Sequence, residues 1–184
     1  GKTTLNVEGL SSISNILFDS SSVGTYTIGS NGVNQQTLVL FSGSLIRLTA
    51  AVNSNQLFNA ALQLGLDRGA SSHTFINSNL FNTLTFAGNL ALSTNAATAG
   101  TKTITVSGPG NMAFTGNLIT NGLSGLTLTD VSNGKLTLSG SNVISSLNLN
   151  GGPNTVVDIG SGYLYVENKG SDLINSTMGG TING

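Results

Sequence analysis

The chain has 184 residues, of which only 7% are charged and 38% are hydrophobic, and its formal net charge is −1. This composition provides no basic patch that could follow a phosphate backbone, so nucleic-acid binding is not expected. No apolar run approaches the ~20 residues of a membrane-spanning helix, and the absence of cysteine excludes disulfides and thiolate metal ligands.

Short runs of alternating apolar and polar residues predict β-strands along the whole chain, because successive side chains of a strand point to opposite faces. Turn sequences such as Asn-Gly, Ser-Gly and Gly-Pro-Gly separate these runs. The predicted strands, in chain order, are Thr3–Val7, Ile16–Asp19, Thr25–Ile28, Thr37–Phe41, Leu45–Thr49, His73–Ile76, Thr83–Ala87, Leu90–Ser93, Lys102–Ser107, Met112–Thr115, Leu126–Asp130, Lys135–Ser139, Ser146–Leu149, Thr155–Ile159 and Tyr163–Glu167.

One stretch, residues 52–66, fits two kinds of secondary structure. Leu57, Ala60 and Leu64 follow the i, i+3, i+7 spacing of a helix, whereas Leu62 and Leu64 also alternate as in a strand. The strand is the preferred interpretation. The same stretch, extended to residue 72, departs from the pattern of the rest of the chain and is a candidate insertion between regular units.

A loose repeat emerges in the second half of the chain. Its members are LTFAGN at Leu84, MAFTGN at Met112, LTLSGSN at Leu136 and LYVEN at Leu164, which follow one another at near-regular intervals. A period of about 24 to 28 residues suits one coil of a β-solenoid, because a single coil cannot bury its inward face and stacked coils close a continuous core. We therefore predict an all-β single domain over residues 1–184, a β-solenoid of about seven coils with asparagine ladders and glycines at its corners.

Asn-Gly dipeptides leave a second fold open. An Asn-Gly pair between two strands is typical of an antiparallel hairpin, and such pairs occur at Asn121, Asn133 and Asn150. The alternative prediction is therefore an antiparallel β-sandwich. The near-regular repeat favours the solenoid.

The segments GNMAFTGN, GKLTLSGSN and SLNLNGG, with the closing GGTING at Gly179–Gly184, resemble the autotransporter-associated β-strand repeats. These repeats occur in the passenger regions of bacterial type V secreted proteins. The match extends from about Thr83 to the C-terminus, whereas before Ala51 only the composition is shared. The resemblance implies a right-handed parallel β-helix displayed at the cell surface, but no single activity, since passengers include adhesins, toxins, enzymes and inert stalks.

Five residues are candidates for ligand binding. Asp67 and Arg68, with His73 nearby, are the only dense group of ionisable residues, but one local carboxylate falls short of the pair that glycoside hydrolysis requires. A solvated loop with one ion pair is the preferred interpretation, and His73 is expected at the surface or with its hydrogen bonds satisfied. Tyr163 and Tyr165 share one face of a strand and bind sugar or protein if outward, or end the core if inward. No catalytic or metal-binding residue and no cofactor is predicted.

Threonine pairs with one residue between them begin at Thr25, Thr83, Thr103 and Thr127. Regular arrays of outward threonines on a flat solenoid face are typical of ice-binding proteins. Here the first interval is more than twice as long as either later one, so the pairs do not form a regular array along the sequence. We interpret them as ordinary exposed strand positions, which threonine favours.

Two classes of function follow. The first is a non-enzymatic extracellular structural or adhesive protein, such as a surface rod, filament or surface-layer subunit, which is secreted or displayed on the bacterial outer surface. Because the chain begins at Gly1 and shows no capping segment, we expect a piece of a longer protein whose ends join neighbouring coils or other copies. Neighbouring coils or other copies are the first expected partner, and a host surface or a glycan is a further candidate. The alternative is a carbohydrate-binding or carbohydrate-cleaving β-helix module.

Overall fold

The computed structural model describes residues 3–7, 12–30, 32–64, 69–121, 123–167, 174–175 and 181–184. These residues form stacked coils of β-strands that pair in parallel, and one short 3-10 turn, η1 (Ala96–Thr98), is the single helical element among them. The coils enclose one continuous apolar core. The predicted all-β solenoid is therefore confirmed.

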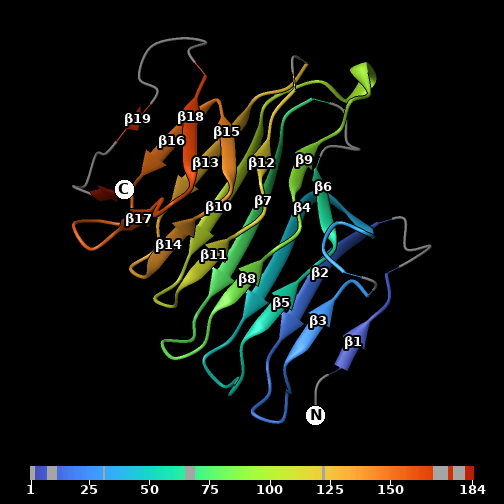
Figure 1. Ribbon diagram of the computed structural model, residues 1–184, viewed down its shortest axis with the longest axis vertical. Coiled ribbons are helices and arrows are strands. Elements are labelled where there is room, and N and C mark those ends of the chain that lie inside the picture. Colours follow the sequence, from blue (N-terminus) through green and yellow to red (C-terminus); the bar gives the residue numbers. More distant parts are fainter. Residues whose placement is uncertain are drawn as a thin grey trace.

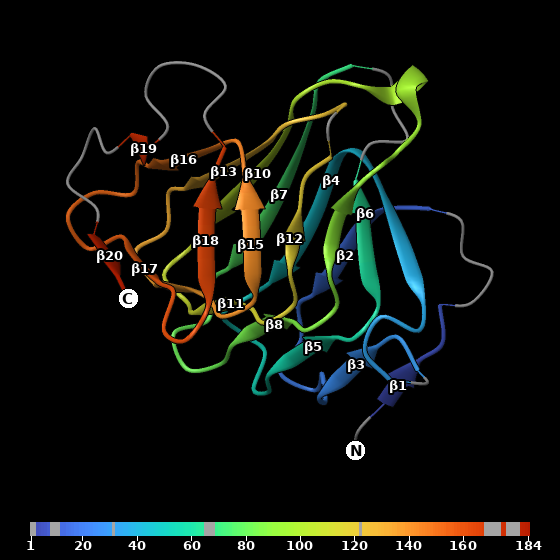
Figure 2. The ribbon, with the colours of Figure 1, turned by 45° about the horizontal axis from the view of Figure 1, so that its top comes forward.

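Three walls run along the solenoid, and each receives one strand from successive coils (Figures 1 and 2). Wall 1 consists of β1 (Thr3–Leu5), β3 (Tyr26–Ile28), β5 (Gln56–Phe58), β8 (Leu84–Phe86), β11 (Met112–Phe114), β14 (Lys135–Leu138), β17 (Val156–Asp158) and β20 (Thr181–Asn183). Wall 2 consists of the first part of β4 (Thr37–Leu48), β6 (Ala61–Leu64), β9 (Leu90–Leu92), β12 (Leu118–Ile119), β15 (Ser141–Ile144) and β18 (Tyr163–Val166). Wall 3 consists of β2 (Ile13–Phe18), the second part of β4, β7 (Ser71–Asn77), β10 (Lys102–Ser107), β13 (Leu126–Asp130), β16 (Ser146–Leu149) and β19 (Ile174–Asn175).

Six successive coils supply a strand to every wall, from the coil of β3 and β4 to the coil of β17, β18 and β19. Strands β1 and β2 belong to a coil before them, and β20 belongs to a coil after them. The antiparallel sandwich is wrong, because the paired strands of the described residues run parallel to one another in all three walls. In the described residues, the isolated bridge between Asn121 and Ser124 is the single antiparallel pairing.

Strand β4 merges two of the predicted strands. The chain continues from wall 2 into wall 3 without a break, and Gly43 adopts a φ of 79° between the two parts. A side chain at that φ would be strained, so glycine suits the bend. Leu38 and Leu40 before the bend and Ile46 after it all face the core.

Residues 52–64 belong to regular coils and do not form an insertion. Strand β5 pairs with β8 in wall 1, and β6 pairs with β9 in wall 2. Phe58, Leu62 and Leu64 are buried at alternate strand positions. Of the helical and strand spacings that this stretch fits, the strand spacing is therefore the correct one. Residues 69–72 likewise lead into and begin β7, while residues 65–68 lie outside the described part of the chain.

The sequence repeat corresponds to wall 1, with one exception. Leu84, Met112 and Leu136 are register partners in β8, β11 and β14, as their alignment predicted. Leu164 is not the next member, because it lies in β18 of wall 2. Val157 of β17 takes that position instead and follows Leu136 sooner in the sequence, since this coil is shorter than those before it.

Aromatic rings form an internal column along wall 1. The ring centroids of Phe58 and Phe86 lie 5.0 Å apart, and those of Phe86 and Phe114 lie 4.9 Å apart. Phe75 stacks on Phe86 from wall 3, with a centroid separation of 4.9 Å. These separations are close to the strand spacing, so parallel stacking of the coils also stacks the rings. The phenylalanine rings therefore form a ladder inside the core.

The Gly-Asn part of the repeat lies at the corner between walls 1 and 2, where consecutive coils come into backbone contact. A Cβ on Gly116 would lie 2.4 Å from the carbonyl oxygen of Gly88, and one on Gly140 would lie 2.3 Å from that of Gly116. None of these three glycines has a positive φ. The close approach of neighbouring backbones, rather than a positive φ, therefore requires glycine at this corner.

Asparagines at this corner form the predicted ladder. Oδ1 of Asn34 accepts the backbone N–H of Asn89 at 2.6 Å, and Oδ1 of Asn89 accepts that of Asn117 at 3.0 Å. Oδ1 of Asn117 in turn accepts the N–H of Ser141 at 2.8 Å. Each asparagine therefore satisfies a backbone donor of a later coil at a position outside the strand ladders.

Candidate functional site

His73 lies inside the solenoid on β7, and its side chain is fully buried. Its Nδ1 lies 2.8 Å from Oγ of Ser44, and its Nε2 lies 3.1 Å from Oγ of Ser71. Both ring nitrogens therefore have a hydroxyl partner. From the sequence, we expect His73 either at the surface or with its hydrogen bonds satisfied. The structure shows the second case, because the ring is buried and both of its nitrogens have a partner.

Lys102 extends this polar cluster by one coil. Its backbone is the register partner of Ser71, its side chain is fully buried, and its Nζ donates to the carbonyl oxygen of Gly69. Burial of an ammonium group is costly unless it is hydrogen-bonded. We call Ser44, Ser71, His73 and Lys102 the polar corner, because they lie where walls 2 and 3 meet.

The polar corner does not present its groups to a substrate. Ser44 and Ser71 are 1% and 5% exposed, and His73 and Lys102 are 0% exposed. A serine nucleophile and a histidine base must contact the substrate to act on it. We therefore assign a structural role to this cluster. The other two predicted residues of this region, Asp67 and Arg68, lie outside the described residues.

Tyr163 and Tyr165 point away from the core. They are 57% and 49% exposed, whereas Leu164 and Val166 of the same strand pack against the core. Strand β18 pairs with β15, so that Tyr165 lies beside Val143 in register. The sequence left open whether Tyr163 and Tyr165 face outward or inward. The structure shows that both face outward, and the two side chains form one exposed aromatic strip.

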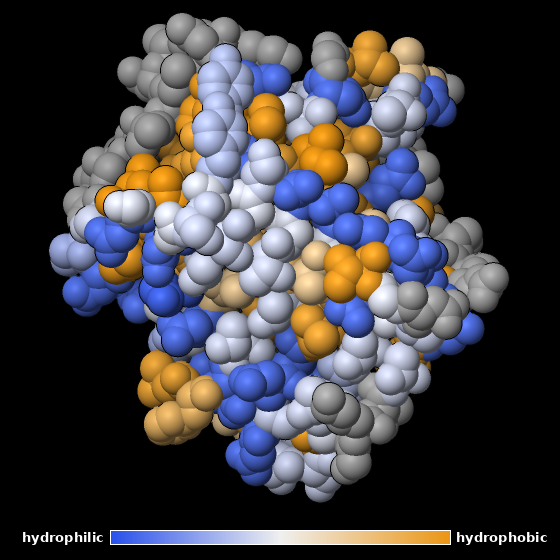
Figure 3. Space-filling view, in the orientation of Figure 1, coloured by the Kyte–Doolittle hydropathy of each residue, from blue (hydrophilic) through white to orange (hydrophobic). Residues whose placement is uncertain are grey.

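The tyrosine pair belongs to an uncharged wall. Figure 2 shows β18, β15, β12, β9 and β6 side by side, and Figure 3 shows hydrophobic and hydrophilic residues mixed in small patches over one face of the molecule. The outward residues of the wall 2 strands are Thr37, Val39, Phe41, Ala61, Gln63, Ala91, Ile119, Ser141, Val143, Tyr163 and Tyr165. Flat, uncharged and partly aromatic surfaces of this kind are suited to contact with sugars or proteins.

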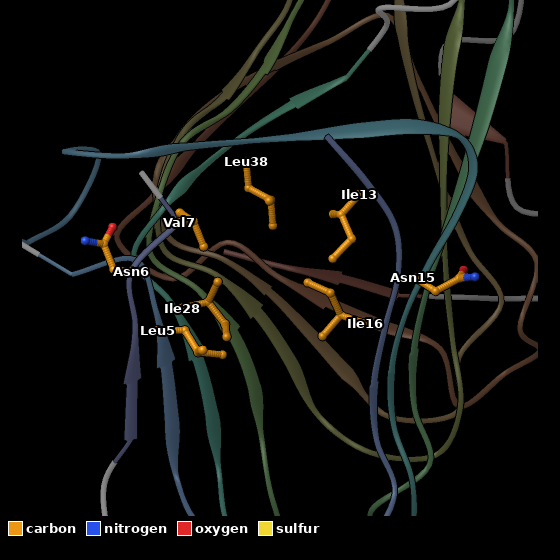
Figure 4. A pocket seen from close by; sticks show the side chains of 8 residues that line it. All are labelled: Leu5, Asn6, Val7, Ile13, Asn15, Ile16, Ile28 and Leu38. Carbon is orange, nitrogen blue, oxygen red and sulfur yellow. The ribbon is translucent and has the colours of Figure 1, made fainter. Parts of the chain in front are cut away.

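An apolar pocket of about 230 Å³ opens at the β1 end of the solenoid (Figure 4). Six apolar side chains point toward one another there, while two asparagines point away (Figure 4). The lining residues are Leu5, Val7, Ile13, Ile16, Ile28 and Leu38, together with Asn6 and Asn15. The pocket is therefore bounded by strands of the first two coils.

Within the described ranges, no group of three or more His, Asp or Glu residues could hold a metal ion. No helix in that part of the chain is long and apolar enough to cross a membrane. The sequence analysis missed the burial of Lys102, although one signal was present. In the run KTITV, Lys102 alternates in phase with Ile104 and Val106, which both face the core.

Comparison of the chain with protein-family models, with curated proteins and with solved structures finds no match. The fold therefore defines the class, a parallel β-solenoid, and the exposed surfaces are the basis for a functional assignment.

Proposed function

We propose that this chain is a non-enzymatic structural and adhesive protein of the bacterial outer surface. It forms a β-solenoid rod, comparable to the stalk of an autotransporter passenger, and wall 2 makes the adhesive contacts. The observation that carries this proposal is the outward pair of Tyr163 and Tyr165 on a wall without charged outward residues. The resemblance of the repeat to passenger repeats supports placement at the cell surface.

The chemistry of the tyrosine pair favours a glycan as the partner. A tyrosine ring offers an apolar face for a sugar ring and a hydroxyl for its hydrogen bonds, and it loses little conformational entropy on binding. Side chains at positions i and i+2 of one strand lie about 6.7 Å apart. Two neighbouring sugar units of a chain therefore match the pair better than one isolated sugar does.

The polar corner supports a non-enzymatic role. Its serine hydroxyls and imidazole are buried and bound to one another, so they hold the corner together rather than contact a substrate. The pocket at the β1 end supports a structural role, because Leu5 is 45% exposed beside an apolar interior. We propose that a neighbouring coil fills this pocket, supplied by a longer parent chain or by a second copy.

A glycan array and an adhesion assay on glycan-coated beads test the proposal. We expect the chain to bind at least one class of polysaccharide, and a variant with Tyr163→Ser and Tyr165→Ser to lose that binding. Phe81→Ser is the matched control, because Phe81 is 91% exposed at a turn outside wall 2. Equal loss in both variants would show general apolar adhesion and exclude wall 2 as the site.

The same preparations distinguish the alternatives. Release of reducing sugar from a bound polysaccharide would exclude the non-enzymatic assignment and favour a carbohydrate-cleaving β-helix. Light scattering measures the oligomeric state and so tests whether a second copy fills the β1-end pocket. Monomers at high concentration, unchanged when Leu5 is replaced by aspartate, would exclude a second copy as the occupant of the β1-end pocket.

A further inference from the structure

Four neighbouring strands of wall 3 carry a two-column array of small polar side chains on their outer face. Strands β7, β10, β13 and β16 lie side by side (Figure 1) and pair in parallel register. We call the eight residues the hydroxyl array. Its first column is Ser72, Thr103, Thr127 and Ser146, and its second column is Thr74, Thr105, Thr129 and Asn148.

The array is regular in space although it is irregular in sequence. Along its first column, the sequence interval between register partners shortens at every step from Ser72 to Ser146. The coils differ in length at their corners, whereas the walls keep one strand per coil. The threonine pairs that begin at Thr25 and Thr83 belong to wall 1, where Thr27 and Thr85 face outward. The irregular intervals in the sequence therefore arise because the threonine pairs belong to two different walls.

The side chains of the array are held in fixed positions. Each alternates with a buried residue of its strand, and β-branched threonine is restricted at χ1. Oγ of Ser146 donates to Oγ1 of Thr127 at 2.9 Å, and Nδ2 of Asn148 donates to Oγ1 of Thr129 at 3.3 Å. Little conformational entropy remains to be lost when such a surface binds a rigid partner.

The array is a two-dimensional lattice of uncharged groups. It repeats at about 4.8 Å along the solenoid and at about 6.7 Å along each strand, and its four strands span about 14 Å. None of the eight residues is charged or aromatic. A charged group would keep its own hydration shell, and an aromatic ring would favour a sugar ring. Fixed hydroxyls instead hold bridging waters at regular positions.

We propose that the hydroxyl array binds the surface of an ice crystal. The ligand is water itself, ordered on a rigid lattice whose repeats are comparable to those of the array. Hydroxyls hold the first water layer in place, and the threonine methyl groups exclude disordered water between them. This activity is independent of glycan binding, because the array lies on wall 3 and the tyrosine pair lies on wall 2.

Inhibition of ice recrystallisation by the purified chain tests the proposal, with thermal hysteresis as the second measurement. We expect the chain to keep ice grains small. Thr105→Tyr, which raises a bulky uncharged group from the middle of the array, should abolish this effect. Thr85→Tyr is the matched control, because Thr85 is an outward threonine at the centre of a wall 1 strand. It should retain the effect in full.

Circular dichroism and thermal melting establish that both variants are folded. Ser72→Tyr, at the exposed edge of the array, replaces Thr105→Tyr if the latter does not fold. Absence of any effect of the unmodified chain on ice would overturn the proposal, and so would equal loss in the wall 1 and wall 3 variants. Binding to cellulose or chitin powder that Thr105→Tyr removes, without an effect on ice, would assign the array to a polysaccharide instead.

Discussion

Asp130 carries a carboxylate whose environment couples the stability of the fold to pH. It ends β13 with its side chain in the interior, and burial raises the pKa of this carboxyl above its usual value. A hydrogen bond from the backbone N–H of Ser132 to Oδ1, at 2.9 Å, opposes the rise. Oδ2 has no hydrogen-bond partner in the described structure. The charged form is therefore incompletely compensated.

The raised pKa fixes the sign of the pH dependence. The folded state binds this proton more tightly than the unfolded state, so the contribution to stability is fully present below the unfolded pKa of about 3.8 and is lost as pH rises through the folded pKa. We expect the melting temperature of the wild-type chain, measured relative to Asp130→Asn, to fall as pH increases from 3 to 7. Asp158→Asn is the control, since it removes an exposed ion pair with Lys135 that contributes at most about 1 kcal/mol. A constant difference between wild type and Asp130→Asn would contradict the assignment.

At the residue scale, period-two alternation predicted which side chains face the core more reliably than residue type did. It placed Ile104, Val106 and Leu128 correctly, and it also indicated that Lys102 and His73 point inward. Charge and polarity argued for the opposite placement. The partners that make burial tolerable, such as Ser44 and the Gly69 carbonyl, come from other coils and cannot be identified without the register.

At the scale of the element, the corner glycines are the positions most sensitive to change. We expect Gly116→Ala to lower the free energy of unfolding by about 1–3 kcal/mol, because backbone atoms that cannot move aside occupy the space of the new methyl group. Urea denaturation measures the loss. Gly43→Ala is the control, since its Cβ would meet nothing within 4 Å and only its φ of 79° opposes the change. A smaller loss at Gly116 than at Gly43 would show that the coils can separate at this corner.

The sequence did not allow strands to be predicted where they are very short or where a turn sequence overlaps their first residues. Strand β12 has two residues, Leu118 and Ile119, which is too few for alternation to be detected. Strand β15 follows the Ser-Gly turn directly, so its first residues, Ser141 and Asn142, resembled the end of that turn. Both strands form because their neighbours in wall 2 already offer a parallel edge, which is information from the assembled coils.

At the scale of the whole molecule, a coil is the unit that can be removed. Deletion of residues 88–115 joins Ala87 to Gly116, which occupies the position of Gly88 one coil later. We expect this variant to keep a β-type circular dichroism spectrum and a cooperative melt, with a smaller denaturant dependence of its unfolding free energy. Deletion of residues 88–101 is the control, because it joins a wall 1 strand to a wall 3 strand and should prevent folding. Folding of both variants, or of neither, would contradict a modular stack.

Because each described strand pairs only with strands of the coils on either side of it, the ends of the solenoid should respond to mechanical load in a graded way. Phe86 and Phe114 are register partners in adjacent coils, so the chain between them makes one full turn of the solenoid. Such a coil occupies about 4.8 Å of the rod and spans roughly 95 Å as an extended chain once it is pulled free. Tension would thus release slack one coil at a time, and the chain would act as an extensible tether that shortens again when the load is removed.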